Sequence, residues 1–248
     1  MPICQLCRKD RELRNSHIVP EFLYEKLYND KNHMMAINGL GSKGWKPLQQ
    51  GIREPLFCEC CEQHFNEYCE KPFRKQWVVA DPLPDPWRVD EPYWIKLDYS
   101  SFKLFHLSVL FRASVSSLPT YAEVSLGQQH EDRLRQMILA QDPGQPWQYP
   151  VLGLVVIHHE TNSIVQMVSQ VQRSRFNEHP CYGIIYGGVQ WWTSVSSHRN
   201  HEFEHAALQQ DGQMPFHAIP WNELEVVQTA ATMLRNTRPK ADKQRSKT

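Results

Sequence analysis

The chain of 248 residues lacks both a long apolar run and a net charge. No apolar stretch approaches the roughly 20 residues that a membrane-spanning helix needs. Lysine plus arginine number 27, as do aspartate plus glutamate. No overall basic field therefore points to nucleic acid, and binding of that kind would need a local patch. The chain begins on a cysteine pair instead of a charged and then apolar signal segment. We expect a globular, cytoplasmic protein without membrane partners.

Common catalytic fingerprints are missing as well. The sequence has no internal repeat, and residues 93–235 contain no glycine-rich phosphate loop, cofactor fingerprint or catalytic triad pattern. Its seven cysteines are an odd number. Paired cysteine spacing without a signal segment favours metal binding over disulfide bonds. The cysteines are therefore the strongest functional signal in the sequence.

Four of the cysteines form two CxxC pairs, Cys4/Cys7 and Cys58/Cys61. Each pair can place two sulfur atoms on one metal, and four thiolates complete a tetrahedral Zn²⁺ shell with Zn–S distances of about 2.3 Å. We predict one structural zinc ion. The alternatives are two separate knuckles or redox-active thiols. The other three cysteines are expected to be small buried or idle thiols: Cys60, Cys69 and Cys181.

The remaining pattern predicts an α+β protein with two modules. Prolines disfavour regular structure over 81–92, so we expect a linker there between a zinc-bound module at 1–80 and an α+β domain at 93–235. The basic segment 236–248 is expected to be a disordered tail. Helices are predicted from Pro20 to about 28, after Cys61, and over 99–117, 130–141 and 222–234. Strands of an antiparallel sheet are predicted over 151–157, 163–171, 182–186 and 189–195, with Gly187-Gly188 as a hairpin turn.

A histidine and a glutamate lie near the cysteines in sequence. His17 stands just before an expected helix, and Glu62 follows Cys61 directly. A zinc ion that gathers the cysteines would bring these two side chains towards each other. Histidine can serve as a general base, and glutamate suits a hard cation such as Mg²⁺ or Mn²⁺. The alternatives are a structural or zinc-binding role for His17 and helix capping for Glu62.

The order and spacing of Cys4-x-x-Cys7, His17-Ile18-Val19-Pro20 and Cys58-x-x-Cys61-Glu62 resemble the treble-clef HNH endonucleases, which have a ββα-metal fold. The likeness is closest to junction-resolving enzymes of the endonuclease VII type and covers about the first third of the chain. The surroundings of His17 and the stretch 104–117 also resemble a group of uncharacterised bacterial HNH-like proteins. The resemblance implies metal-dependent hydrolysis of DNA, or alternatively RNA, with His17 as general base and Glu62 on a catalytic Mg²⁺ or Mn²⁺.

Ser16 departs from this family pattern, because an aspartate that binds the catalytic metal is usual at its place. Asn66 and Glu70 follow Glu62 by one and two helical turns, so they are the favoured candidates to complete the metal shell. Two further candidates are Asn15 and His64. The serine keeps open an alternative function, a non-catalytic zinc module that binds nucleic acid or protein, with the C-terminal domain as a sensor or partner-binding unit.

Basic residues near both cysteine pairs and in the glycine-punctuated stretch 37–52 are candidate phosphate contacts, with solvated surface as the alternative. They are Arg8, Arg11, Arg14, Lys43, Lys46, Arg74 and Lys75. Cleavage of both strands would favour a homodimer. The second module is expected to bind a target, a protein partner or a small ligand, and HNH proteins with such attached domains suggest defence against phage or plasmids.

Overall fold

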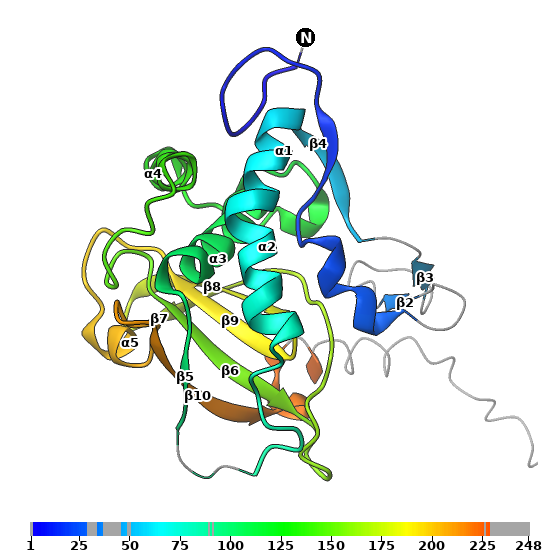
Figure 1. The fold of residues 1–248 in the computed structure, drawn as a ribbon, viewed down its shortest axis with the longest axis vertical. Helices are drawn as coiled ribbons and strands as arrows, with labels where there is room; N and C mark the ends of the chain where they lie inside the picture. Colours follow the sequence, from blue (N-terminus) through cyan, green and yellow to red (C-terminus); the bar gives the residue numbers. More distant parts are fainter. Residues whose placement is uncertain are drawn as a thin grey trace, which may run out of the picture.

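The computed structural model describes residues 2–28, 51–88, 90, 92–225 and 227–228, and the backbone of 34–36 and 46–48. Its strands are β1 (Arg14–His17), β2 (Met34–Ala36), β3 (Lys46–Leu48), β4 (Arg53–Phe57), β5 (Tyr93–Lys96), β6 (Val151–Ile157), β7 (Gln172–Phe176), β8 (His179–Tyr186), β9 (Val189–Ser194) and β10 (Gln213–Pro220). Its helices are α1 (Glu59–Phe65), α2 (Lys71–Phe73), α3 (Tyr99–Ser114), α4 (Gln128–Ala140) and α5 (His201–His205). The described residues form the predicted α+β fold (Figure 1).

The N-terminal part is a hairpin followed by a helix. β1 pairs antiparallel with β4, and His17 lies opposite Arg53. α1 begins directly after Cys58, and wider π-helical turns carry the helix through α2 to Val79. The predicted helix after Cys61 is therefore confirmed, and Glu62 lies in its first turn.

The helix predicted from Pro20 is wrong as a regular α-helix. The chain forms two short 3₁₀ turns instead, Glu21–Leu23 and Glu25–Leu27. Backbone bonds such as Leu23 N to Pro20 O, at 3.1 Å, span three residues and tighten this segment. Pro20 still begins the first turn, as its missing N–H allows.

A six-stranded sheet has the order β5-β10-β6-β9-β8-β7. The predicted strand 151–157 is β6, and the predicted strands 182–186 and 189–195 lie within or almost within β8 and β9. Gly187 and Gly188 both have positive φ angles, 59° and 79°, which a tight hairpin turn requires. The prediction of a purely antiparallel sheet is wrong, because β10 lies parallel to β6.

The strand predicted over 163–171 is irregular, with one isolated bridge between Ile164 and Ile157. Its alternating apolar residues Val165 and Met167 instead pack against a small cluster around Val156. Three strands of the six-stranded sheet were not predicted: β5, β7 and β10. α3 ends three residues before the predicted limit, and α4 begins two residues earlier than predicted. The helix predicted over 222–234 lies mostly outside the described residues, as do the 236–248 tail and most of 37–50.

α3 is the centre of the hydrophobic core. Asp98 caps its N-terminus by accepting a 2.9 Å hydrogen bond from Ser101 N, and every residue over 102–113 is buried. A helix that is buried on all sides must lie between other layers. On one side Phe73 stacks on Phe105 at 3.7 Å, and the sheet covers another side. Figure 1 shows the α1–α2 helix running from the N-terminal hairpin, past α3, to the sheet.

The core continues across the proline-rich segment. Trp77, before this segment, makes an edge contact with Trp191 of β9 at 5.0 Å, and Trp87 within it is buried. The module boundaries at 81–92 stay a prediction, but the residues on both sides share one core. Among the described residues, no helix combines the length and apolar character needed to cross a membrane.

Lys103 in α3 is buried, and its ammonium donates hydrogen bonds to Gln145 O at 2.7 Å and Tyr99 Oη at 3.0 Å. Burial lowers the pKa of Lys103 to about 7, although Asp142 opposes this. Between about pH 7 and pH 10, Lys103 is therefore protonated in the unfolded chain and neutral in the folded chain.

We expect the free energy of unfolding of the wild type to rise with pH in this window by up to about 4 kcal/mol relative to Lys103→Met. Urea unfolding of both proteins from pH 6 to 9.5 measures this, and parallel curves would contradict it.

Candidate functional site

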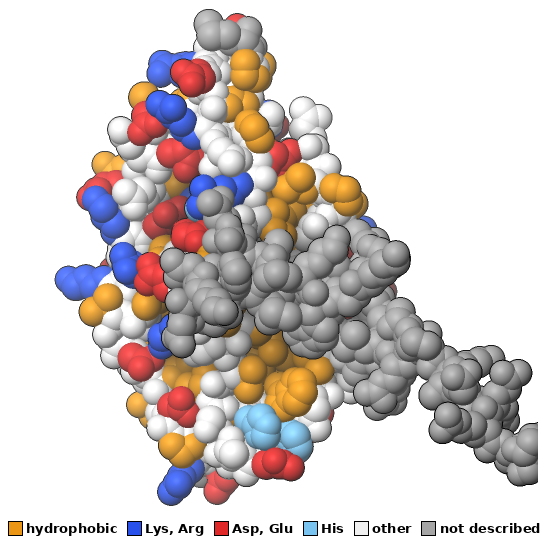
Figure 2. All heavy atoms as spheres, turned by 90° about the vertical axis from the view of Figure 1, so that its right-hand side faces the viewer, with side chains coloured by type: hydrophobic (Ala, Val, Ile, Leu, Met, Phe, Trp, Pro, Cys, Tyr) orange, Lys and Arg blue, Asp and Glu red, His pale blue; other side chains and the backbone are white. Residues whose placement is uncertain are grey.

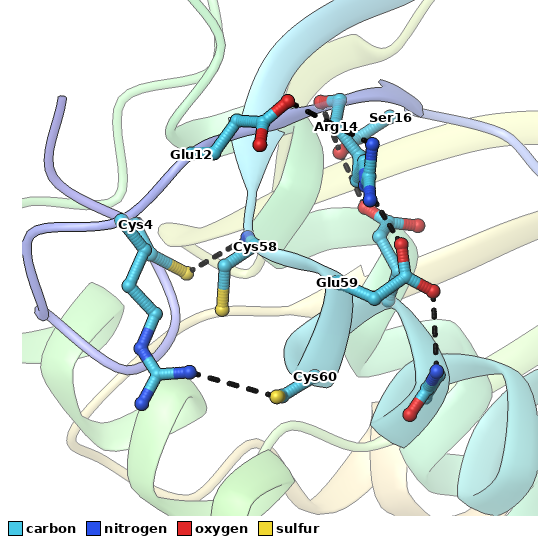
Figure 3. Close-up of polar contacts among 10 residues, drawn as sticks. Cys4, Glu12, Arg14, Ser16, Cys58, Glu59 and Cys60 are labelled. Atoms are coloured by element: carbon cyan, nitrogen blue, oxygen red, sulfur yellow. Dashed lines mark hydrogen bonds and ion pairs between the residues drawn. The ribbon is translucent and has the colours of Figure 1, made fainter. Parts of the chain in front are cut away.

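The four CxxC cysteines converge where the N-terminal turn meets the start of α1. Cys4 and Cys7 lie in a tight turn closed by a 2.9 Å bond from Arg8 N to Cys4 O, and Arg8 has a left-handed φ of 58°. Cys58 caps α1, and Cys61 lies in its first turn. A 3.3 Å hydrogen bond from Cys58 N to Cys4 Sγ joins the two pairs (Figure 3).

The sulfur positions fit a tetrahedral metal ion. All four Sγ atoms lie within 4.8 Å of one another, and those of Cys7 and Cys58 are 3.9 Å apart. A zinc tetrathiolate with Zn–S bonds of about 2.3 Å has sulfur–sulfur separations of about 3.8 Å. Within the described part of the chain, no other set of three or more His, Cys, Asp or Glu residues comes together in this way. The predicted cysteine set is confirmed as a group that can bind zinc.

The other three cysteines lie outside this set, as predicted. Cys69 and Cys181 are buried, whereas Cys60 is exposed and contacts Arg11 Nη1 at 3.6 Å. Figure 3 shows Cys60 on α1, close to Cys58 and Glu59, and Cys60 is not one of the four clustered cysteines. Cys60 is therefore a natural control for substitutions in the set.

The backbone favours negative charge on one of the sulfur atoms. Burial alone would raise the pKa of the Cys4 thiol, but N–H groups of Cys7, Cys58 and Leu6 outweigh it and lower this pKa to about 7. Burial and the neighbouring cysteines raise the pKa of Cys61. Metal binding requires thiolates, so zinc uptake at this site releases protons.

His17 lies at the end of β1 with three charged residues around it. Its Nε2 atom is 2.6 Å from Glu21 Oε2 and also 2.6 Å from Arg53 Nε. Its backbone carbonyl accepts a 3.3 Å hydrogen bond from Arg112 Nη1. Burial, and then the charge of Arg53, lower the pKa of His17, while Glu21 opposes this change. The imidazole is thereby kept neutral near pH 7, the form that a general base requires.

Glu62 faces β1 from the first turn of α1. Ser16 donates a short hydrogen bond from its hydroxyl to Glu62 Oε1. Burial raises the pKa of Glu62, and the charge of Arg112 opposes this increase. The HNH pattern usually has a second carboxylate at the position of Ser16. In this chain the Ser16 hydroxyl stands there and donates a hydrogen bond to the Glu62 carboxylate.

Glu70 pairs with Arg112, which lies in the last turn of α3. Arg112 Nη2 lies 2.6 Å from Glu70 Oε1, and the guanidinium carbon is 4.2 Å from the centre of the Phe65 ring. Arg112 is 2% exposed, and its Nε has no hydrogen-bond partner among the described residues. Asn66, the other candidate metal ligand, is exposed on the π-helical turn between Glu62 and Glu70. The structure therefore pairs Glu70 with Arg112, brings the charge of Arg112 to bear on Glu62, and leaves Asn66 at the surface.

The two further candidates also differ in position. His64 is half-buried, and its Nε2 is 2.8 Å from Ile138 O of α4. Asn15 is exposed in β1.

Three residues around His17 were missed in the sequence. Glu21 could have been found, because it follows His17 by four residues across a helix start. Arg53 depends on the strand register, which the sequence does not specify. Arg112 is 95 positions from His17. No local pattern could reveal this contact.

Several predicted phosphate contacts are engaged with neighbouring groups. Arg14 pairs with Glu59 at 2.7 Å, Arg74 with Glu25 at 3.3 Å, and Arg8 with Gln5 at 2.8 Å. Lys75 is exposed, and the side chains of Lys43 and Lys46 lie outside the described residues. On the face in Figure 2, acidic and basic side chains are intermingled. The visible part of this face has no continuous basic patch.

Comparisons of the chain with protein-family models, curated protein sequences and solved structures found no match. The likeness to HNH endonucleases therefore rests on residues and spacing. Any function must be supported by the contacts around the cysteines and His17.

We expect one zinc ion per chain in the purified protein, measured by elemental analysis. Cys58→Ser and Cys61→Ser should each lose this zinc and lower the melting temperature by about 10 °C or more, because structural zinc contributes several kcal/mol to folding. Cys60→Ser is the matched control and should keep both zinc and melting temperature. Equal zinc loss in all three variants would contradict the assignment.

Arg112→Met should destabilise the zinc-loaded protein by about 3–5 kcal/mol, because it leaves the Glu70 carboxylate without its ion-pair partner in a largely buried position. Adding Glu70→Gln to this variant should recover part of the loss, since no unpaired charge then remains. Urea unfolding of the two single variants and the double variant measures the coupling. Strictly additive losses would show that the ion pair is not responsible.

Proposed function

We propose that this protein is a metal-dependent endonuclease of the HNH type, with a treble-clef zinc module. The observation that carries the proposal is that the cysteine set joins the β1–β4 hairpin to α1. This arrangement fixes His17, at the end of β1, relative to Glu62, in the first turn of α1. A base and a metal-binding carboxylate on one compact ββα unit are the minimum that phosphodiester hydrolysis requires.

His17 is the proposed general base. Its neutral imidazole can take a proton from a water molecule that attacks phosphorus. The Arg112 bond to the His17 carbonyl and the Arg53 pairing across the hairpin hold the backbone of this residue in place. The proton acceptor is thereby supported on both sides of the strand.

Glu62 is the proposed ligand of a catalytic Mg²⁺ or Mn²⁺, with Glu70 and Asn66 as further candidates. The described contacts of Glu62 with Ser16 and of Glu70 with Arg112 each engage the Oε1 atom. This leaves a donor set that suits a hard cation. When bound, such an ion would supply charge neutralisation at the phosphate and the leaving oxygen. Arg112 would favour the ionised Glu62 that this binding requires.

DNA is the proposed substrate, with RNA as the alternative. The balanced charge of the chain means that phosphate contacts must come from a few residues close to His17. A homodimer would allow both strands to be cut, and defence against phage or plasmid DNA is the proposed setting. These parts of the proposal rest on the resemblance to HNH proteins.

A second candidate function is a zinc module that binds nucleic acid or protein without cleavage. Two contacts favour it. Ser16 donates a hydrogen bond to Glu62, and Arg112 neutralises Glu70, so each carboxylate already has one partner within the protein. Polar groups that already have partners gain less from binding a cation.

The test is cleavage of supercoiled plasmid and of branched and single-stranded DNA by zinc-loaded protein with Mg²⁺ or Mn²⁺. His17→Ala should lower the rate by about 100-fold or more, which is the usual contribution of a general base. Glu62→Gln should also lower it by about 100-fold or more, because it removes a charged ligand of the proposed catalytic metal. His205→Ala and Glu67→Gln are the controls, because His205 is exposed and Glu67 lies on the same helix paired with Lys71.

Two results would refute the endonuclease. One is cleavage that persists unchanged in His17→Ala. The other is a lack of cleavage with every metal by folded, zinc-loaded protein. Fluorescence anisotropy with labelled DNA would then test the binding module directly.

A further inference from the structure

Glu21 is the best-anchored charged group beside His17. Its Oε2 atom lies 2.6 Å from His17 Nε2 and accepts a 3.3 Å hydrogen bond from Gly51 N. Its Oε1 atom accepts a short hydrogen bond from the Tyr28 hydroxyl. Arg53 Nη2 is 3.7 Å from Oε2. The carboxylate is therefore fixed from several directions, with one edge against the imidazole.

The surroundings of Glu21 favour its charged form. Burial would raise the pKa of this carboxyl, but the bonds from Tyr28 and Gly51 and the charges of His17 and Arg53 lower it overall. A carboxylate against a ring nitrogen favours the tautomer that carries a proton on that nitrogen. The 2.6 Å contact thus suits an Nε2–H group that donates to Glu21.

Arg53 competes for the same nitrogen, since its Nε lies 2.6 Å from His17 Nε2. A neutral Nε2 cannot donate to Glu21 and also accept from Arg53. With the proton on Nε2, Glu21 accepts it and Nδ1 has the lone pair. With the proton on Nδ1, Nε2 accepts from Arg53. These two neighbours therefore determine which nitrogen of His17 is basic.

Two arguments favour the tautomer bonded to Glu21. Arg53 already lies near a second acceptor, Glu21 Oε2, so it can turn to that oxygen. Proton uptake by His17 also creates an imidazolium, which Glu21 stabilises and Arg53 opposes. The other charged groups facing this residue are Glu70, whose charge favours the imidazolium, and Arg112, which bonds the backbone carbonyl.

We propose that Glu21 is the positioning residue of His17: its carboxylate accepts the Nε2–H bond and leaves Nδ1 as the nitrogen that deprotonates water. This inference rests on the proposed role of His17 as general base. In the step, a water proton moves to Nδ1 and the water oxygen bonds to phosphorus. The phosphorus bond to the leaving oxygen breaks, its electron pair stays on that oxygen, and the oxygen takes a proton from solvent. The Glu21 carboxylate stabilises the positive charge of the resulting imidazolium, as a buried aspartate does for the histidine of a serine protease.

The tautomer can be observed without any cleavage assay. We expect long-range proton–nitrogen NMR spectra of ¹⁵N-labelled, zinc-loaded full chain, recorded above the His17 titration, to show His17 protonated at Nε2. Glu21→Gln should shift the balance towards Nδ1–H, since it removes the negative charge and leaves Arg53 as a donor. Arg53→Met should retain Nε2–H, and His17→Gln identifies the signals. An Nδ1–H tautomer in the wild type, or an unchanged tautomer in Glu21→Gln, would overturn the proposal.

The pH dependence of cleavage gives a second readout. We expect Glu21→Gln to lower the plateau rate by about 100-fold or more, the order that a base with the wrong tautomer loses. The acidic limb of the pH–rate profile of Glu21→Gln should move to lower pH, because loss of the negative charge lowers the pKa of His17. Arg53→Met should move this limb to higher pH, because loss of the positive charge raises the same pKa. Zinc content and unfolding midpoints are checked in both variants. An unchanged plateau and limb in a folded Glu21→Gln protein would overturn the proposal.

The two readouts separate this inference from the proposed function. An active enzyme that needs His17 but is insensitive to Glu21→Gln would overturn the role of Glu21 alone. A protein that cuts no nucleic acid but shows a tautomer controlled by Glu21 would overturn the endonuclease and support the Glu21–His17 pairing.

Discussion

The rest of the N-terminal structure depends on the packing of four thiol groups against one another, those of Cys4, Cys7, Cys58 and Cys61. β1 has four residues and pairs with a single partner, and isolated hairpins of this size are marginal in water. The cysteines tie the preceding turn to the start of α1 and so restrict where the hairpin can lie. Ser16 then reaches Glu62, and His17 lies at a fixed strand end. The cysteine set can thus position His17, Ser16 and Glu62 without including any of them.

Arg112 extends this dependence into the second part of the chain. The guanidinium comes from the last turn of α3 and joins the His17 carbonyl to Glu70. Phe65 and Phe73 also pack on α3 or its side chains. A fragment that ended at residue 92 would lose these contacts and expose apolar surface. The helices and sheet after the proline-rich segment are therefore part of the support of the site.

The sequence allowed prediction of what local signals encode. The CxxC spacing, the position of Glu62 in a first helical turn and the Gly187-Gly188 hairpin depend on neighbours in the chain, and these predictions are confirmed. β7 was missed because it is a polar edge strand, and β10 because its parallel pairing with β6 is not local. The surroundings of His17 were only partly predictable, since strand register supplies Arg53 and tertiary packing supplies Arg112.

The helix from Glu59 to Val79 is attached at both ends. Cys58 and Cys61 hold its beginning, and near its end the Trp77 indole donates a 2.9 Å hydrogen bond to Gly187 O in the β8–β9 turn. At about 1.5 Å per residue, such a helix is a rod about 30 Å long. One continuous helix therefore joins the thiol cluster to a turn of the distant sheet, so the spacing between these two parts of the molecule is set by the length of that helix.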